Sequence, residues 1–181
     1  DVYKRQGVTI MHMAHDLDAG DIIAQAATPI DPDETVVALH DRLAVLGAEL
    51  LVNVVADIAA GTAVRIPQEH DKATLAPMLS RELSPMDWSR PARALHNQVR
   101  GLIPWPAAVT ELGGNRCKVF STSVLDATTS AAPGTILAAG KEGIQVACGE
   151  GTVLRIDELQ ADGGKRMKAA DYLRGHPIPV G

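Results

Sequence analysis

A short polar segment between two apolar runs carries the residues of this chain best suited to chemistry. Residues 15–21 have the sequence His-Asp-Leu-Asp-Ala-Gly-Asp, so three carboxylates and an imidazole lie close together. A positioned carboxylate can orient an imidazole, favour its protonated form and help to relay a proton. The alternative is a turn in which an aspartate bonds to its own backbone. The residues alone leave both interpretations open for Asp18.

A hairpin and a helix are expected to position this segment. Residues 8–13 and 22–30 are apolar and contain β-branched side chains, which predicts two strands joined by a long loop. Residues 33–35 (Asp-Glu-Thr) supply an N-cap and first-turn acids for a helix, whose apolar side chains recur every three or four residues. We expect this helix to end at Gly61 and to be divided in two at Gly47.

The second half of the chain has the pattern of a small β domain. Residues 62–84 show no clear period and predict a linker. A short helix is predicted over residues 91–100, capped by Ser89 and ended by Gly101. Short strands with glycine turns between them then predict a barrel or a sandwich. We expect strands at residues 107–112, 116–125, 134–138, 144–148 and 153–159, and a last helix at residues 168–174.

Composition narrows the class of protein. With 181 residues, 46% of them hydrophobic, the chain can bury one large core or two small ones. No uninterrupted apolar run approaches the roughly 20 residues of a bilayer span, and no secretory signal is apparent. Cys117 and Cys148 lie in apolar, strand-like surroundings, which predicts buried free thiols rather than a disulfide or zinc site. We therefore expect a monomeric cytoplasmic protein with no metal and no membrane contact.

Charge is distributed unevenly along the chain. Residues 1–71 hold four Lys/Arg and twelve Asp/Glu, whereas residues 72–181 hold 13 and 10. The basic second half permits contact with a polyanion such as a nucleic acid. A stand-alone nucleic-acid-binding barrel without chemistry is therefore one possible function, although such a module has no need of the polar hairpin at residues 8–30.

The first six residues are expected to be foreign to the natural sequence. Asp-Val-Tyr-Lys-Arg-Gln matches one translated reading frame of the transposon mosaic end used to prepare sequencing libraries. We expect residues 1–6 to be an adaptor scar and the natural sequence to continue from Gly7, in mid-gene. The DNA upstream of the Gly7 codon in an independent isolate checks this, and a native Asp-Val-Tyr-Lys-Arg-Gln there would contradict it.

A series of motifs resembles the folate-dependent formyltransferases in both content and order, across nearly the whole chain from Gly7. The motifs are Gly-Val-Thr-Ile-Met-His-Met at residues 7–13, Leu-Asp-Ala-Gly-Asp at 17–21, Met-Asp-Trp at 86–88, Arg100 with Pro-Trp-Pro at 104–106, Pro-Gly-Thr-Ile at 133–136, and residues 143–149 and 159–167. The resemblance implies an α/β fold, the rear part of a Rossmann-like catalytic domain, at residues 7–66. A linker at residues 67–85 and an OB-like β-barrel at residues 86–181, which helps to hold tRNA, are implied to follow.

The resemblance also implies the reaction. A formyl group passes from 10-formyltetrahydrofolate to the α-amino group of methionine esterified to initiator tRNA. Attack of the amine builds an oxyanion, which the family stabilises with an Asn and a His, and an ammonium whose proton must leave. Only the family's catalytic aspartate has a counterpart here, Asp18. The Asn and the His are expected upstream with a Ser-Leu-Leu-Pro motif, and His12, His15 and His40 do not match that His. The fragment alone is expected to be inactive.

Binding residues follow from the same resemblance. The pterin ring is implied to lie against the backbone of His15, Asp16, Leu17 and Asp18, although Asp16 replaces a usual Gly and Ala14 a common Asp. For tRNA phosphates we expect contacts from basic residues of the linker and barrel, each of which could instead be a plain surface charge. They are Lys72, Arg81, Arg100, Lys165, Arg166 and Lys168.

Some alternatives remain open on the sequence. Arg100 could brace the turn at Trp105, and Trp88 and Trp105 could either stack on bases or pack between domains. An amine formyltransferase that acts on a sugar nucleotide would share the hairpin and a similar barrel. The Lys-Arg-Met stretch at residues 165–167 favours the tRNA acceptor.

Overall fold

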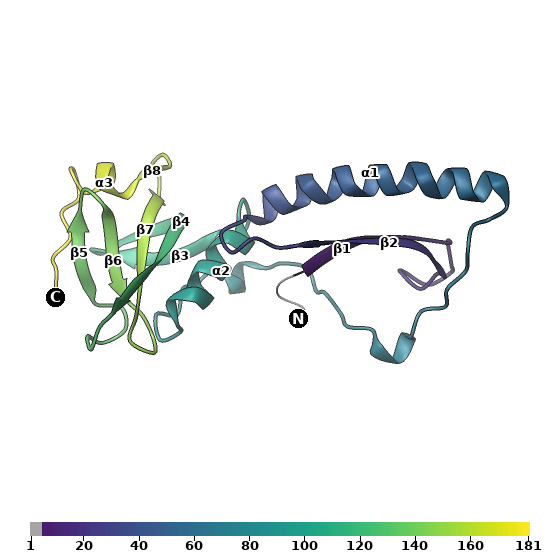
Figure 1. Cartoon of the computed structure of the whole chain (residues 1–181). Helices are drawn as coiled ribbons and strands as arrows, with labels where there is room; N and C mark the ends of the chain where they lie inside the picture. The colour runs from purple at the N-terminus through teal and green to yellow at the C-terminus, as the bar shows by residue number, and fades with distance from the viewer. Residues whose placement is uncertain (1–4) are drawn as a thin grey trace. The chain divides into compact units, whose positions relative to one another are not determined.

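A computed structural model describes residues 5–181, which form two compact units divided between Met78 and Leu79 (Figure 1). Each unit is described by itself. Of the expected adaptor scar, residues 1–4 lie outside the described residues, whereas Arg5 and Gln6 belong to the first strand.

Unit 1, which ends at Met78, is built on the predicted hairpin. Strands β1 (Arg5–Met11) and β2 (Ile22–Pro29) pair antiparallel, with a register shift between Ile10 and Met11 just before the loop. Helix α1 (Val36–Ala60) runs alongside the hairpin in Figure 1 and contacts both strands. The strands confirm the sequence prediction, and β1 begins three residues earlier than expected.

Helix α1 is continuous, so the predicted break at Gly47 is wrong. The helix begins with the Thr35 hydroxyl accepting a hydrogen bond from the Ala38 amide (3.2 Å), and Gly61 ends it at φ 70°, as predicted. A Cβ placed on Gly47 would lie only 3.2 Å from Val8 Cγ1. The glycine therefore serves a close approach of helix and strand, and the helix tolerates it because its flanking residues are good helix formers.

The outer face of α1 is apolar and exposed. Only Val54 is buried in this helix, whereas Val45, Val52 and Val55 are 61%, 70% and 56% exposed. By length and composition alone α1 is apolar enough to cross a bilayer. Counting uninterrupted apolar runs missed this property, because Glu49 and Asp57 interrupt the sequence. The exposed apolar surface agrees with a helix that lacks part of its packing partner.

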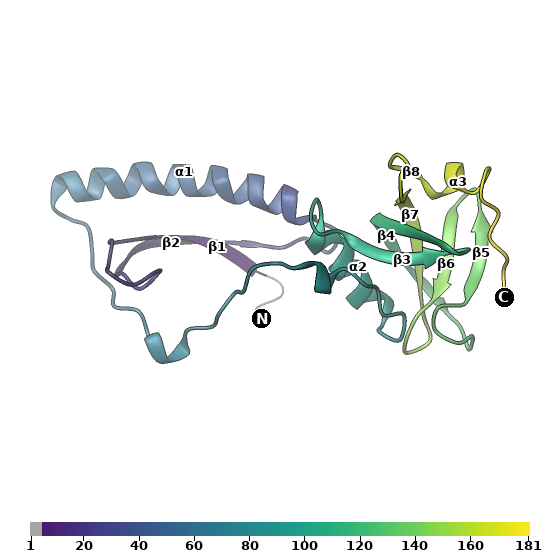
Figure 2. The ribbon, with the colours of Figure 1, turned by 180° about the vertical axis from the view of Figure 1, so that it is seen from behind.

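Unit 2, from Leu79 onward, contains all five predicted strands. Each differs from its expected boundaries by three residues or fewer. They are β3 (Ala108–Leu112), β4 (Asn115–Thr128), β5 (Ile136–Gly140), β6 (Gly143–Ala147) and β7 (Thr152–Ala161), with a short β8 (Met167–Lys168). The sheet order is β3-β4-β7-β6-β5, with β8 on β7 and β3 at one edge (Figure 2). Three register shifts in β4 bend the sheet. Among residues 5–181 no pairing joins β3 to β5, so the expected OB-like barrel is not confirmed and no closed barrel is seen.

One helix covers the core of unit 2. In α2 (Ala92–Leu102) the side chains of Leu95 and Val99 are buried, as predicted, against the apolar face of the sheet. The predicted cap is wrong: Pro91 is the N-cap, and the Ser89 hydroxyl instead donates to Asp87 Oδ1 (2.6 Å), which lowers the pKa of that carboxyl. The helix also continues through Gly101, since nothing there requires a left-handed residue.

Two details complete unit 2. The last helix, α3 (Ala169–Tyr172), is shorter than the predicted span, and η2 (Arg81–Leu83) is a single 3-10 turn. Unit 1 contains a similar turn, η1 (His70–Lys72). Cys117 and Cys148 are buried free thiols, as predicted. Burial raises the pKa of the Cys148 thiol to about 11, so it stays protonated and unreactive at neutral pH.

Candidate functional site

The loop between β1 and β2, residues 12–21, brings the predicted folate-binding residues together. His15, Asp16, Leu17 and Asp18 are all exposed, and Leu17 is 96% exposed. An apolar side chain held this far in solvent costs free energy unless a ligand or another segment covers it. The loop therefore offers an apolar side chain that a flat ligand or another segment could cover.

Asp18 is the loop carboxylate left available for chemistry. His15 Nδ1 lies 3.4 Å from Asp16 Oδ1, and the Arg65 guanidinium donates to Asp21 Oδ2 (3.0 Å). Within residues 5–181 the Asp18 carboxylate makes neither an ion pair nor a hydrogen bond, so the interpretation of a turn aspartate bonding to its own backbone is not supported. Asp18 also has φ 52°, a left-handed conformation that Asp and Asn adopt more readily than most residues. Backbone strain of this kind is common at functional sites.

Gly20 closes the loop because nothing larger fits. A Cβ at this position would lie 1.7 Å from the carbonyl oxygen of His12. The two sides of the loop meet here, and the His12 amide donates to the Asp21 carbonyl (2.9 Å). The sequence reasoning assigned Gly20 to the turn; the close approach to His12 is visible only in the structure.

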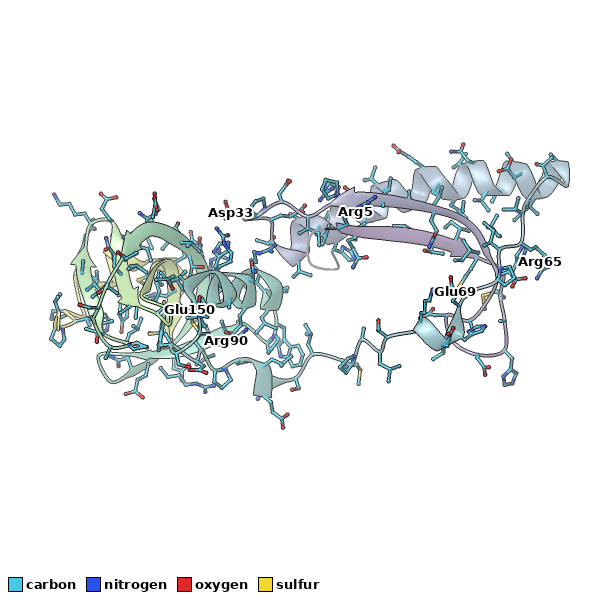
Figure 3. All side chains as sticks on the ribbon, turned by 60° about the horizontal axis from the view of Figure 1, so that its bottom comes forward. Arg5, Asp33, Arg65, Glu69, Arg90 and Glu150 are labelled. Carbon is cyan, nitrogen blue, oxygen red and sulfur yellow. The ribbon has the colours of Figure 1, made fainter. Side chains whose placement is uncertain are left out.

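Residues 65–68, called the return segment below, fasten the loop from across unit 1. Ile66 forms an antiparallel bridge with Ile22 through two hydrogen bonds of 2.8 and 3.0 Å. The Gln68 side-chain amide then donates to the carbonyl oxygens of Asp18 (2.8 Å) and Gly20 (2.7 Å). Figure 3 labels Arg65 and Glu69, which mark this segment beside the loop end of the hairpin. The sequence analysis missed Gln68, whose only local signal is the alternation of Val64, Arg65 and Ile66.

We expect Gln68→Ala to loosen the loop. The variant loses two hydrogen bonds, each contributing about 0.5–1.5 kcal/mol. Amide hydrogen exchange of the full chain should therefore accelerate at residues 12–22 by roughly tenfold or more. Gln25→Ala is the matched control, because among residues 5–181 the Gln25 amide donates only to the Thr9 hydroxyl on the exposed face of the hairpin (3.0 Å). Equal exchange in the two variants would contradict the clamp.

The loop is chemically compatible with a folate ring. His12 Nε2, at the base of the loop, is buried without a hydrogen-bond partner among the described residues. A pterin ring offers N–H and C=O groups that can satisfy such an atom, and the exposed Leu17 can cover its flat face. This makes His12 a candidate ligand contact and gives it no catalytic role. Among residues 5–181 no group of three His, Cys, Asp or Glu side chains is placed to hold a metal ion.

The basic residues predicted to contact tRNA are dispersed. Lys72 lies in unit 1 and pairs with Glu69, whereas the other five lie in unit 2. Arg81 lines two adjoining cavities beside β3. Arg166 pairs with Glu158 and stacks over Phe120, 4.8 Å from the ring centre. Arg100 Nε donates to Asn97 Oδ1 (2.8 Å), Lys165 lies in the exposed turn before β8, and Lys168 lines a different cavity.

Matches to known protein families divide the chain near the boundary between units 1 and 2. A family model described as "Formyl transferase" matches residues 2–55, and one described as "Formyl transferase, C-terminal domain" matches residues 78–177. The loop and most of α1 lie in the first match, and all the strands of unit 2 lie in the second.

Curated and solved proteins agree with these matches. A methionyl-tRNA formyltransferase of Bacillus subtilis (strain 168) is 45% identical over 178 residues, which is 98% of this chain and 56% of that protein. Among solved structures, HypX from Aquifex aeolicus in complex with tetrahydrofolic acid has a TM-score of 0.74 at 18% identity, over 99% of this chain and 32% of that one. A methionyl-tRNA formyltransferase from Clostridium thermocellum has a TM-score of 0.51 at 15% identity, over 81% and 58%.

The two solved structures establish the fold alone, and the chain spans about half the length of the curated relatives it matches. Helix α1 lies largely within the first match. With the C-terminal family model matching 100 of its 181 residues, the chain belongs to the formyl transferase family.

Proposed function

We propose that this chain is part of an enzyme that transfers a formyl group from 10-formyltetrahydrofolate to the amino group of methionyl-initiator tRNA in translation initiation. The observation that carries the proposal is the 45% identity to a methionyl-tRNA formyltransferase across 98% of the chain. In this proposal the enzyme is a cytoplasmic monomer, and upstream sequence covers the apolar outer face of α1. Residues 7–66 are the rear of the catalytic domain, residues 67–85 the linker, and residues 86–181 an OB-like arrangement of the open sheet.

Asp18 is the catalytic residue in this proposal. Its carboxylate is exposed and without a partner among residues 5–181, so it is free to favour the protonated form of an imidazole from the upstream segment. A carboxylate so placed also helps the proton of the nascent ammonium to leave. The backbone of His15, Asp16, Leu17 and Asp18 would hold the pterin ring of the folate that supplies the formyl group. Gln68 keeps that backbone in place by its two hydrogen bonds.

The tRNA would be held by basic side chains of the linker and of unit 2. Lys165 and Lys168 make no ion pair within residues 5–181, so each can contact a phosphate directly. Binding a phosphate would require three of the other residues to give up a side-chain partner, which lowers the net gain in binding free energy. These are Lys72, Arg100 and Arg166. Arg81 belongs to the groove described in the next subsection.

Formylation by the full-length parent protein tests the proposal. We expect transfer of the formyl group from 10-formyltetrahydrofolate to methionyl-tRNA, measured as acid-stable formylmethionyl-tRNA. An amino-sugar nucleotide offered as the acceptor in parallel is expected to react far more slowly. A preference for the sugar nucleotide would identify the protein as a sugar-nucleotide amine formyltransferase instead. No transfer to either acceptor would overturn the proposal.

A further inference from the structure

A groove on unit 2 gathers basic and aromatic side chains that take no part in the formyl-transfer step itself. Two adjoining cavities of about 520 and 240 Å³ share Arg81, Ser84, Val109 and Arg116 in their walls, so they form one continuous hollow beside the edge strand β3. We call it the basic groove. Its smaller end also contains Lys118 and Trp105.

The strand register brings the cations of the basic groove to one face. Arg116 and Lys118 are two residues apart on β4, so their side chains point the same way, and Lys118 lies opposite Val109 of β3. Cys117 and Val119, which alternate with them, are fully buried in the core. The turn η2 supplies Arg81 to the same hollow. A rigid sheet thus fixes where the charges lie.

The cations of the basic groove have no side-chain partner among the described residues. Within residues 5–181 the side chains of Arg81, Arg116 and Lys118 make no ion pair and no hydrogen bond. The whole groove sets these three cations against two carboxylates, Glu111 at the larger end and Asp162 at the smaller end. Several other basic side chains of the chain are neutralised by a nearby acid: Arg42, Arg65, Lys72, Arg155, Arg166 and Arg174. The basic groove is therefore a place where a phosphate gains contacts without displacing a carboxylate.

Trp105 gives the basic groove a flat apolar surface. Its side chain is 52% exposed, although Pro106 next to it is buried and anchors the turn. Trp88, in contrast, is half-buried and donates Nε1–H to the Thr110 hydroxyl (3.1 Å). An exposed indole beside unpaired cations suits a nucleobase with its phosphate, because every base offers a face for stacking. An acidic peptide would use the cations and leave the indole uncovered.

We propose that the basic groove binds an unpaired nucleotide of the RNA substrate, its phosphate among Arg81, Arg116 and Lys118 and its base on Trp105. The inference rests on the proposed function, because it names where unit 2 holds the tRNA. It assigns Arg116 and Lys118 to RNA binding, and neither was among the residues expected from the sequence to contact phosphates. For Trp105 it chooses stacking on a base, one of the two alternatives that the sequence left open.

The test is binding of initiator tRNA and of a short oligouridylate to the full chain. We expect Arg116→Ala to weaken both affinities about tenfold at low salt. The fall of log affinity with log salt should also become less steep, by about one unit of slope. Arg174→Ala removes the same charge from an exposed position paired with Asp171, outside the basic groove, and should change neither. Equal affinities of the two variants for both RNAs would overturn the inference.

The stacking half of the proposal has its own readout. With Trp88→Phe as the background, Trp105 is the remaining indole of the chain, and its fluorescence should be quenched when oligouridylate binds. Trp105→Ala should lose about tenfold in affinity, and Trp105→Phe should recover most of it. Polyglutamate that binds as tightly as oligouridylate, with no effect of Trp105→Ala, would identify an acidic-peptide site and overturn the proposal.

These results are separable from the proposed function. If the parent protein formylates methionyl-tRNA and the groove variants bind RNA like the wild type, the basic groove inference fails and the function stands. If the parent does not formylate methionyl-tRNA but Arg116→Ala and Trp105→Ala bind RNA more weakly than the wild type, the RNA site stands and the function fails.

Discussion

Replacing Asp18 with asparagine should lower the turnover of the full-length enzyme by about 10²–10⁴-fold with little change in its affinity for methionyl-tRNA. The amide has the shape of the carboxylate but no charge, so it cannot favour a protonated imidazole or help a proton to leave. Asn also tolerates the left-handed backbone that Asp18 adopts (φ 52°), so the loop should keep its conformation. The measurements are kcat for formylation and the dissociation constant of methionyl-tRNA.

A second aspartate provides the control for this prediction. Asp41→Asn removes the same charge from the exposed surface of α1, where Asp41 faces His40. We expect it to leave both turnover and tRNA affinity unchanged. If Asp18→Asn were as active as Asp41→Asn, Asp18 would not be catalytic.

Gly149→Ala should strongly destabilise unit 2. A Cβ at Gly149 would lie 1.8 Å from the carbonyl oxygen of Ser89 and 2.6 Å from its carbonyl carbon. The backbone cannot move aside easily, because the Gly149 amide donates to the Trp88 and Arg90 carbonyls (2.9 and 3.0 Å), and Pro91 forms a parallel bridge with Gly149. Figure 3 labels Arg90 and Glu150 on the two segments that meet here. We expect a loss of more than about 4 kcal/mol and a fall in Tm of more than about 15 °C.

Thermal unfolding followed by tryptophan fluorescence measures this effect selectively, because both tryptophans of the chain lie in unit 2. Gly101→Ala is the matched control: no atom lies within 4 Å of the added Cβ, and Ala suits the last turn of α2 better than Gly. Its Tm should stay the same or rise slightly. Equal melting of the two variants would mean that the Ser89–Gly149 contact is looser than the structure indicates.

The sequence predicted most of the fold because its signals were local. Alternating side chains and paired glycines located the strands of unit 2 within a few residues, and the threonine and glycine at the ends of α1 located that helix. Gly47 was misjudged for the opposite reason. Its contact with Val8 is formed by packing of α1 on β1, and a helix propensity says nothing about such packing.

The candidate site was predictable only in part. The ordered motifs led directly to Asp18 and its neighbours, but Gln68 lies 50 residues farther along the chain in a stretch without periodicity. Arg116 and Lys118 escaped notice because an alternating charged face on one strand is the ordinary pattern of a solvated surface. They form a cluster only when η2 places Arg81 beside them, which depends on tertiary structure.

The clamp made by Gln68 limits how genes of this family can be recombined. The return segment lies between the two matched stretches, residues 2–55 and 78–177, so it belongs to neither of them. A chimera joined between residues 55 and 68 would combine the loop of one parent with the clamp of another. Crossovers placed after Gln68, near the division at Met78, take the loop and the clamp from the same parent. Shuffled libraries should therefore retain active members chiefly at that junction.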